Sequence, residues 1–395
     1  MDDHKVDHLF LIIGKNPLPN YVVARSDKLL RKEGKAYLVY TTDTKPYAYK
    51  LRDKLKLSNK ELVSLGNYQS DAYEIQERIK AKAKDLEGRL GLNYTGGTKA
   101  MSVNAYLAIQ SLRRSEDPVF SYLDSKKLEL LIDRPDRKSI PVPFEIDISF
   151  EDIFDLHQLK LLNSPNNQAI VPELANSILL HNNTWRQWCE DVLHVEAKRE
   201  KDNGRIDWKS KGELKKTFLS LEGLNLELIE SLDRNECLDK QKQNIDVKGM
   251  LEKHAFSKPE NVCKWLDGIW LEEYLLGQIG KHFQKPGMSF KVDINNGKDF
   301  EFDVAFIRGY QLFAFSCTSS SDRSLCKAKL FEAYVRGKQL GGDEARVALV
   351  CCSDDDTIQR EMEVAISDRT IRVFRQSHLE NIADEIIDWV DSLES

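Results

Sequence analysis

The sequence predicts an α/β protein with two separate α/β cores joined by a mostly helical segment. Apolar runs of strand length alternate with amphipathic stretches from residue 6 to about 135, and a second such pattern begins near residue 262. Residues 150 to about 250 show helical periodicity, many charges and no clear strands. Because 395 residues exceed what one hydrophobic core usually supports, we expect units at residues 1–140, 141–255 and 256–395.

The composition limits the classes of function. Hydrophobic residues make up 41% and charged residues 31%, which is typical of a globular chain. The net charge of −6 excludes a basic surface that holds nucleic acid non-specifically, so any polyanion must bind at a local site. The seven cysteines include no C-x-x-C pair and lie beside no histidine at zinc-ligand spacing, which indicates reduced packing residues.

Neither a membrane segment nor a secretion signal is expected. The sequence has no run of about 18 apolar residues, and its first residues lack the basic and apolar stretches of a signal peptide. These features predict a cytoplasmic location without membrane contact.

The first unit has the pattern of a Rossmann-like, doubly wound parallel sheet. Helical patterns at residues 71–86 and 100–112 lie between runs of strand type. The predicted strands are residues 8–13, 36–40, 61–65, 90–94 and 119–123, with a further strand at 128–132 before a turn-rich linker at 134–143.

A strand passes directly into a helix at Thr95-Gly96-Gly97-Thr98-Lys99. The two glycines allow a sharp turn with outward N–H groups, the helix start adds partial positive charge, and Lys99 adds a full charge. We expect Thr95, Thr98 and Ser102 to donate hydroxyl protons to a phosphate. The alternative is a glycine pair that only caps a tight turn, which leaves the threonines, lysine and serine unexplained.

The spacing of the glycines excludes two better-known types of phosphate-binding loop. A Walker A loop needs four residues before its Gly-Lys pair, and the dinucleotide fingerprint needs G-x-G-x-x-G. The loop after the first strand, residues 14–20, lies at the same sheet edge and is either a second wall of the site or an ordinary surface loop. Asp124, after the strand ending at residue 123, either hydrogen-bonds a ribose or base or simply ends the strand.

The last unit is predicted to contain a helix, three strands, a second helix and a fourth strand, in that order. The segments are a helix at 262–283, strands at 290–294 and 300–307 around a turn at 295–298, a strand at 312–317, a helix at 323–340 and a strand at 346–352. This is the order of the restriction-endonuclease-like fold, although it occurs in other folds too. The middle unit includes an amphipathic segment at 214–232, and a winged helix there would give a similar pattern.

The segment 93–102, together with residues 14–19 and Leu156-His157, resembles the CARF sensors (CRISPR-associated Rossmann fold) of type III CRISPR ancillary nucleases. The subgroup that fuses this sensor to a restriction-endonuclease-like domain is the most similar, over nearly the whole chain. The resemblance implies a cyclic oligoadenylate ligand, above all cyclic tetra-adenylate, bound across a homodimer, whose symmetry suits a ring of phosphates. The expected ligand-binding residues are Gly14, Asn16, Asn93, Thr95, Gly96, Gly97, Thr98, Lys99, Ser102 and Asp124.

The same resemblance implies a Mg²⁺- or Mn²⁺-dependent nuclease site of the PD-(D/E)xK type. Glu272, in a Trp-Leu-Glu helix, and Asp303, among apolar strand residues, are the expected metal ligands and catalytic carboxylates. The chain departs from the pattern at Ser316-Cys317-Thr318, which lacks the third acidic ligand and the lysine. A lysine on the following helix, Lys327 or Lys329, is expected to take over, and we assign Lys329 as catalytic. Trp265 and Trp270 are expected in the core.

Three functions follow from these patterns. The first is a nuclease that cuts DNA or RNA when a cyclic oligoadenylate binds the sensor. The second is a non-catalytic sensor whose altered nuclease-like unit binds nucleic acid or a protein partner. The third is a ligand-controlled transcription regulator, which lacks a strongly basic recognition segment at residues 165–250.

Overall fold

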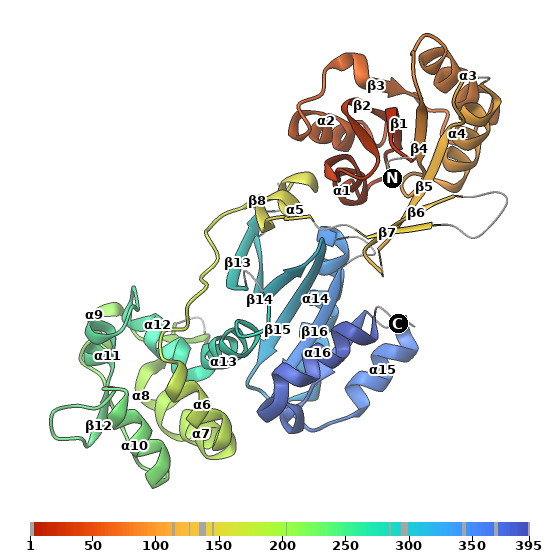
Figure 1. The fold of residues 1–395 in the computed structure, drawn as a ribbon. Helices are drawn as coiled ribbons and strands as arrows, with labels where there is room; N and C mark the ends of the chain where they lie inside the picture. The colour runs from red at the N-terminus through yellow and green to blue at the C-terminus, as the bar shows by residue number, and fades with distance from the viewer. Residues whose placement is uncertain are drawn as a thin grey trace.

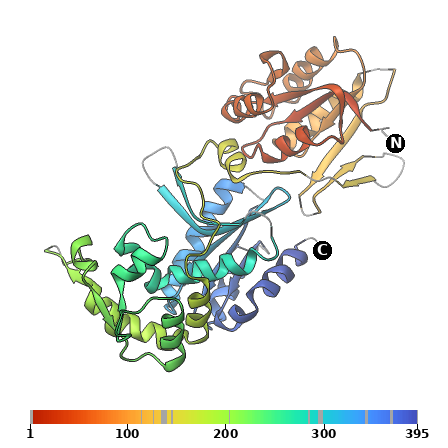
Figure 2. The same ribbon diagram turned by 60° about the vertical axis from the view of Figure 1, so that its left-hand side comes forward.

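The structure is a computed structural model, and two α/β units lie end to end in it with a third, largely helical unit beside the second (Figures 1 and 2). It describes residues 4–112, 115–125, 127–133, 140–143, 146–202, 204–283, 286–293, 299–341, 345–366 and 370–393. None of the described helices is both long and apolar enough to cross a membrane.

The first unit is built on a seven-stranded sheet of order β3-β2-β1-β4-β5-β6-β7. The strands are β1 Val6–Ile12, β2 Leu30–Tyr40, β3 Leu62–Ser64, β4 Leu90–Asn93, β5 Val119–Asp124, β6 Glu129–Ile132 and β7 Ile140–Pro143. The first five pair in parallel, and β6 and β7 extend the sheet antiparallel. All six predicted strands are present, whereas the predicted linker at 134–143 is wrong at its end, where β7 forms. Residues 134–138 lie outside the described residues.

Helices cover both faces of this sheet, as predicted for a doubly wound fold. They are α1 Leu18–Arg25, α2 Lys45–Lys54, α3 Ala72–Ala83 and α4 Lys99–Ser111, with a 3-10 turn at Asn59–Glu61. Along β1, Leu9 and Leu11 pack into the cluster that includes α1 and α2, while Phe10 and Ile12 pack into the cluster that includes α3 and α4. Since successive strand residues point to opposite faces, an uninterrupted apolar run is what a sheet buried on both faces requires.

The last unit contains a six-stranded sheet of order β17-β16-β15-β14-β13-β8. Strands β13, β14 and β15 pair antiparallel, and β15, β16 and β17 pair in parallel. The predicted order is confirmed as far as β16, and the turn at 295–298 lies outside the described residues. Its elements are β8 Lys160–Leu161, β13 Gly287–Asp293, β14 Asp299–Arg308, β15 Gln311–Thr318, α14 Arg323–Gly341, β16 Arg346–Cys351, α15 Thr357–Ile366, β17 Ile371–Phe374, a 3-10 turn Gln376–Asn381 and α16 Ile382–Ser392.

The middle segment is helical but not free of strands, which corrects the sequence prediction. Two short antiparallel pairs form, β9 with β10 and β11 with β12, and β11 interrupts the amphipathic helix predicted at 214–232. Strands of three residues are too short for alternation to show in a sequence. The elements are α5 Phe150–Leu156, α6 Pro172–Leu180, α7 Asn182–Trp188, π-helix η2 Cys189–Leu193, α8 His194–Ala197, β9 Lys198–Glu200, β10 Ile206–Trp208, α9 Lys211–Leu214, β11 Phe218–Ser220, α10 Leu226–Arg234, β12 Asn244–Asp246 and α11 Val247–Lys253. The last unit then begins with α12 Pro259–Lys264, π-helix η3 Trp265–Ile269 and α13 Trp270–Ile279.

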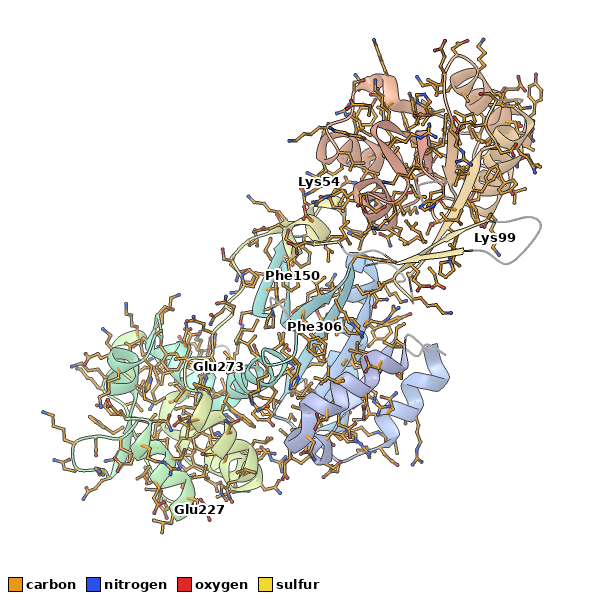
Figure 3. All side chains as sticks on the ribbon, in the orientation of Figure 1. Lys54, Lys99, Phe150, Glu227, Glu273 and Phe306 are labelled. Atoms are coloured by element: carbon orange, nitrogen blue, oxygen red, sulfur yellow. The ribbon has the colours of Figure 1, made fainter. Side chains whose placement is uncertain are left out.

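One hydrophobic cluster joins the middle segment to the second sheet. It contains Trp185 of α7, Trp265 of η3, Trp270 of α13 and Phe306 of β14, and both predicted core tryptophans are buried. Figure 3 marks Phe306 and, on α13, Glu273, whose carboxylate accepts a hydrogen bond of 3.1 Å from the backbone N–H of Val171. The middle segment therefore packs against the second sheet in one hydrophobic core.

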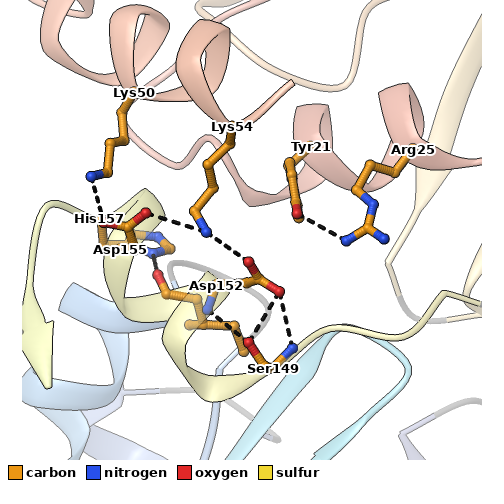
Figure 4. Close-up of polar contacts among 9 residues, drawn as sticks. Tyr21, Arg25, Lys50, Lys54, Ser149, Asp152, Asp155 and His157 are labelled. Atoms are coloured by element: carbon orange, nitrogen blue, oxygen red, sulfur yellow. Dashed lines mark hydrogen bonds and ion pairs between the residues drawn. The ribbon is translucent and has the colours of Figure 1, made fainter. Parts of the chain in front are cut away.

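Helix α5 connects the two α/β units. Its Phe150 ring lies 4.5 Å from the ring of Phe290 in β13, and Lys54 of α2 bonds Asp152 at 2.6 Å and Asp155 at 3.2 Å (Figure 4). Burial by itself would raise the pKa of Asp152, but bonds from Lys54 and Ser149 outweigh burial and lower it. The sensor-like sheet and the second sheet thus meet through a helix that is held on both sides.

Candidate functional site

The loop between β4 and α4 has a shape that only glycine permits. Gly97 has a φ of +77°, and a Cβ there would lie 2.2 Å from Cγ2 of Ile12. A Cβ on Gly96 would lie 2.2 Å from the carbonyl oxygen of Ile12, and one on Gly14 would lie 3.0 Å from the Gly97 nitrogen. The two loops predicted to form opposing walls therefore touch each other.

The backbone amides of this loop are open. In the part of the chain that the structure describes, the N–H groups of residues 96–100 have no hydrogen-bond acceptor. Gly97, Thr98 and Lys99 are exposed, and they stand at the start of the 13-residue helix α4. A helix start with unsatisfied N–H groups and an adjacent lysine attracts anions.

Three hydroxyl groups of the loop have partners inside the protein. Thr98 Oγ1 accepts the Met101 N–H at 3.2 Å and donates to the Gln69 carbonyl at 3.3 Å. Thr95 Oγ1 accepts the Leu123 N–H at 2.7 Å, and Ser102 Oγ donates to the Gly96 carbonyl at 3.2 Å. These bonds help to hold the loop in shape, and contact of the hydroxyl groups with a phosphate stays a prediction.

Asn93 and Asp124 also have internal partners. Asn93 is buried, donates from Nδ2 to Ser121 Oγ at 3.1 Å, and accepts the Thr95 N–H at 3.3 Å. Asp124 accepts the Lys127 N–H at 3.3 Å in the turn after β5. Both residues brace the strand ends next to the loop.

The loop after β1 contacts the connecting helix α5. Asn16 Oδ1 accepts the Leu18 N–H at 3.1 Å and lies 3.2 Å from Nε2 of His157, whose Nδ1 lies 2.8 Å from the Ile153 carbonyl oxygen. Burial lowers the pKa of His157. The family resemblance included the segments of Asn16 and His157. Their contact could not be predicted from the sequence, because the two residues are 141 positions apart.

Asn20 was not predicted as a site residue. Its Nδ2 donates to the Ile12 carbonyl at 3.1 Å and stands 2.8 Å from where a Gly96 Cβ would be. Its Oδ1 is buried and has no partner among the described residues. An asparagine behind two touching loops leaves no periodic signal in the sequence.

A second candidate site is a cavity of about 880 Å³ between the middle segment and the second sheet. It lies far from Lys99, which Figure 3 labels in the first unit. Glu272 of α13, Thr318 of β15 and Lys329 of α14 line it. The remaining lining residues are His194, Val195, Lys198, Ile206, Asp207, Trp208, Lys264, Asp267, Gly268, Ile269, Cys317 and Ser319.

Asp303 of β14 does not line the cavity but contacts Cys317 and Lys329, which do. Its Oδ2 accepts the Cys317 N–H at 2.6 Å and the Ser316 hydroxyl at 3.1 Å, and lies 3.8 Å from Nζ of Lys329. Lys329 also donates to the Cys317 carbonyl at 2.8 Å. Burial raises the pKa of Asp303, although the Lys329 charge opposes the rise.

Glu272 completes the acidic group. Burial raises its pKa well above the ordinary value, and the charges of Asp303 and Glu301 raise it further. The structure thus brings Glu272, Asp303 and Lys329 to one place, whereas Lys327, the other lysine considered, pairs with Glu361.

The donor set suits a hard divalent cation in part. Two carboxylates whose pKa values are both raised, Glu272 in part by the charge of Asp303, form the kind of site whose charge Mg²⁺ or Mn²⁺ compensates. Among the described residues, however, no group of three or more His, Cys, Asp or Glu side chains could hold a metal ion. Water and the backbone or hydroxyl oxygens of residues 316–318 would have to complete the shell.

Three polar residues of the cavity were not predicted. Asp267 accepts from His194 Nε2 at 2.6 Å and from Lys198 Nζ at 3.1 Å. Burial by itself would raise the pKa of Asp267, but the His194 bond and the Lys198 charge outweigh burial and lower it. His194 and Asp267 are 73 positions apart, so only the fold reveals the pair.

No protein-family model matches the sequence, and no curated protein matches it significantly. Solved structures do share its fold. Can2 from Sulfobacillus thermosulfidooxidans, solved with cyclic tetra-adenylate, is 14% identical with a TM-score of 0.71, over 97% of this chain and 99% of Can2. Protein VC1899 from Vibrio cholerae is 15% identical with a TM-score of 0.69, over 98% of each chain. A type III CRISPR defence DNA nuclease activated by cyclic oligoadenylate is 15% identical with a TM-score of 0.50, over 87% of this chain and 45% of the nuclease. The chain therefore has the α/β fold that these proteins share.

Proposed function

We propose that this protein is a metal-dependent nuclease activated by a cyclic oligoadenylate, with a role in type III CRISPR antiviral defence. The observation that carries the proposal is one chain that holds both an open, amide-lined loop and a distant cavity lined by Glu272 and Lys329, with Asp303 beside Lys329. The fold shared with Can2 over nearly the full length of both chains supports the choice of ligand.

The ligand would bind at residues 96–100. Each phosphate would accept hydrogen bonds from the open amides and lie beside Lys99, and two copies of the loop in a homodimer would match the two-fold symmetry of cyclic tetra-adenylate. Ligand binding would change the conformation of the first unit. The contact from Asn16 to His157 and the ion pairs of α5 would transmit this conformational change to the second sheet.

In the cavity, Glu272 and Asp303 would hold Mg²⁺ or Mn²⁺. The ion would polarise the phosphate of the substrate and would lower the pKa of a bound water molecule. The Cys317 N–H and the Ser316 hydroxyl fix the Asp303 carboxylate, so that it does not need to reorganise. Lys329, 3.8 Å from Asp303, would balance negative charge on the phosphate.

Calorimetric titration with cyclic oligoadenylates of different ring sizes tests the sensor half. Cyclic tetra-adenylate should bind wild type, and Lys99→Ala should bind at least tenfold more weakly, because one charge at a phosphate contact is lost. Equal binding by the two proteins would contradict the assignment of the loop.

Cleavage assays with plasmid, single-stranded DNA and RNA, each with Mn²⁺ or Mg²⁺, test the nuclease half. We expect ligand-dependent cutting that Asp303→Asn abolishes. Cutting by none of these combinations would reject the nuclease and leave the second function, a sensor without catalysis. The Ser316-Cys317-Thr318 segment, which replaces an acidic ligand and a lysine, favours that second function.

A further inference from the structure

The cavity contains a polar group that the proposed function leaves unused. His194 begins α8 and Lys198 begins β9, both in the middle segment, while Glu272 lies on α13 and Thr318 on β15. All four line the same cavity. The middle segment is therefore part of the candidate active site.

Two neighbouring π-helical turns position this group. One, η2, ends directly before His194, and the other, η3, contains Asp267. The Trp185 indole N–H donates to the Leu266 carbonyl at 2.9 Å, and Ser319 Oγ donates to the Asp267 carbonyl at 3.1 Å. The turns are thus fixed to each other and to the end of β15. Single π-turns inside helices often occur at functional sites.

The hydrogen bonds of His194 leave one ring nitrogen for a substrate. Nε2 lies 2.6 Å from Asp267 Oδ1, so this nitrogen donates to the carboxylate. Nδ1 has no hydrogen-bond partner in the described ranges, and the side chain is 35% exposed. A carboxylate that accepts a hydrogen bond from one imidazole nitrogen orients the ring.

The charges around the ring are mixed. Lys198 bonds the same carboxylate and lies 4.5 Å from the centroid of the Trp208 ring. Lys264, Lys329 and Asp207 also line the cavity. Three lysines in one cavity can hold the phosphates on either side of a cleaved bond.

We propose that His194, oriented by Asp267, is a catalytic residue that protonates the leaving oxygen when a phosphodiester is cleaved in this cavity. This inference rests on the proposed nuclease function. Water forms a new P–O bond while the bond from phosphorus to the sugar oxygen breaks, and its electron pair stays on that oxygen. The Nδ1 proton passes to the oxygen, which gives a hydroxyl and a phosphate monoester. The ring regains a proton through solvent from the water that attacked.

A leaving-group substitution tests this role. His194→Gln keeps an amide donor for Asp267 but cannot act as an acid, and we expect it to cut ordinary DNA or RNA at least 100-fold more slowly than wild type. Substrates with sulfur in place of the 3′- or the 5′-bridging oxygen expel a thiolate, which needs no proton. On one of these two substrates the variant should come within about fivefold of wild type.

Two results of this experiment would contradict the proposed role of His194. A His194→Gln variant as fast as wild type on ordinary substrate, or equally slow on all three substrates, overturns the role of His194 as an acid. Asp267→Asn, which changes only the positioning residue, should show the same recovery on the sulfur substrate after a smaller loss. His282→Ala is the matched control, since this histidine is exposed and does not line the cavity, and it should match wild type.

Ligand binding separates this inference from the proposed function. His194→Gln should bind cyclic tetra-adenylate like wild type, because the loop at residues 96–100 belongs to a different sheet. If wild type cuts no substrate, the nuclease function fails and the role of His194 with it. If wild type cuts and the variant shows either contrary result, only the role of His194 fails.

Discussion

At the scale of single residues, Gly96 and Gly97 show how closely the loop between β4 and α4, the proposed ligand loop, packs against Ile12. Their missing side chains make room for the backbone and side chain of Ile12, while the amides on the other side stay open. A ligand that binds backbone amides depends on the path of the chain more than on side-chain identity. Substitutions that shift the path should therefore act as strongly as loss of Lys99.

Gly97→Ala should impair both folding and binding. The new Cβ would overlap Ile12 at a positive φ, and we expect a loss of about 1–3 kcal/mol of unfolding free energy and at least tenfold weaker binding of cyclic tetra-adenylate. Urea denaturation and calorimetry measure the two effects. Gly212→Ala is the control, because a Cβ there meets nothing within 4 Å, and both quantities should stay unchanged. A Gly97→Ala protein of normal affinity would contradict the role of the loop.

Glu272→Gln should stabilise the protein and abolish cleavage. Because the pKa of Glu272 is raised in the folded state, its ionised form opposes folding, so wild type loses stability as the pH rises from the carboxyl's ordinary pKa through the raised one. We expect a gain on the order of 1 kcal/mol near pH 8 that shrinks toward pH 4. Denaturation at both pH values measures it. A less stable variant at pH 8 would show that the Glu272 charge is already compensated.

Mn²⁺ should make wild type more stable than the Glu272→Gln variant, which reverses the order expected without metal. Bound metal neutralises the carboxylates, so a concentration of 100 times Kd should stabilise wild type by about 2.7 kcal/mol. The Glu272→Gln protein, which lacks one ligand, should gain much less. Thermal unfolding with and without Mn²⁺ measures the gain independently of activity, and an equal gain in both proteins would place the metal elsewhere.

At the scale of elements, α5 is the segment that connects the two α/β units, and we propose that ligand binding acts on the second sheet through it. It receives Lys54 from α2 on one side and packs Phe150 against β13 on the other, and His157 at its end contacts the loop of Asn16. The pKa of Asp152 is lowered, so its ion pair supports folding above the ordinary pKa of the carboxyl and is lost as the pH falls through the lowered value.

Lys54→Ala should uncouple ligand binding from cleavage. The variant loses the bonds to Asp152 and Asp155, and we expect near-normal affinity for the ligand but at least fivefold lower ligand-dependent cleavage. Its unfolding free energy should fall by about 1 kcal/mol. Lys248→Ala, which removes an exposed pair with Glu252, is the control and should change neither. Full activation of Lys54→Ala would exclude this route.

At the scale of the whole molecule, the first unit has an apolar surface next to the ligand loop. Val103 and Leu107 lie one turn apart on α4 and are 58% and 45% exposed. Tyr122 of β5 is 40% exposed, and its ring lies 5.7 Å from that of Tyr94. Since α4 begins at the ligand loop, a second copy of the chain bound on this surface would bring two loops together.

The proposed homodimer should therefore depend on α4. A Val103→Glu, Leu107→Glu double variant should sediment as a monomer at concentrations where wild type is a dimer, and it should bind cyclic tetra-adenylate at least tenfold more weakly. Leu180→Glu changes an exposed leucine of α6 and serves as the control. Sedimentation of wild type as a monomer in the presence of the ligand would reject the dimer.

The sequence by itself determined the features that local chemistry controls. Strand runs buried on both faces, the glycine pair at a strand-to-helix corner, and acidic residues at Glu272 and Asp303 each leave a pattern within a few residues. The N–H groups of residues 96–100 are unpaired among the described residues, as the glycine pair predicted, whereas the bonds of Thr98 to Gln69 and of Thr95 to Leu123 left no local pattern.

Tertiary structure decided the rest. That Lys329 rather than Lys327 reaches Asp303, that His194 meets Asp267, and that the middle segment lines the cavity all depend on how distant elements pack. Periodicity along a chain reports which face of an element is buried, because it reflects neighbours a few residues apart. Which elements share a site depends on packing across tens to hundreds of residues, and no local pattern carries that information.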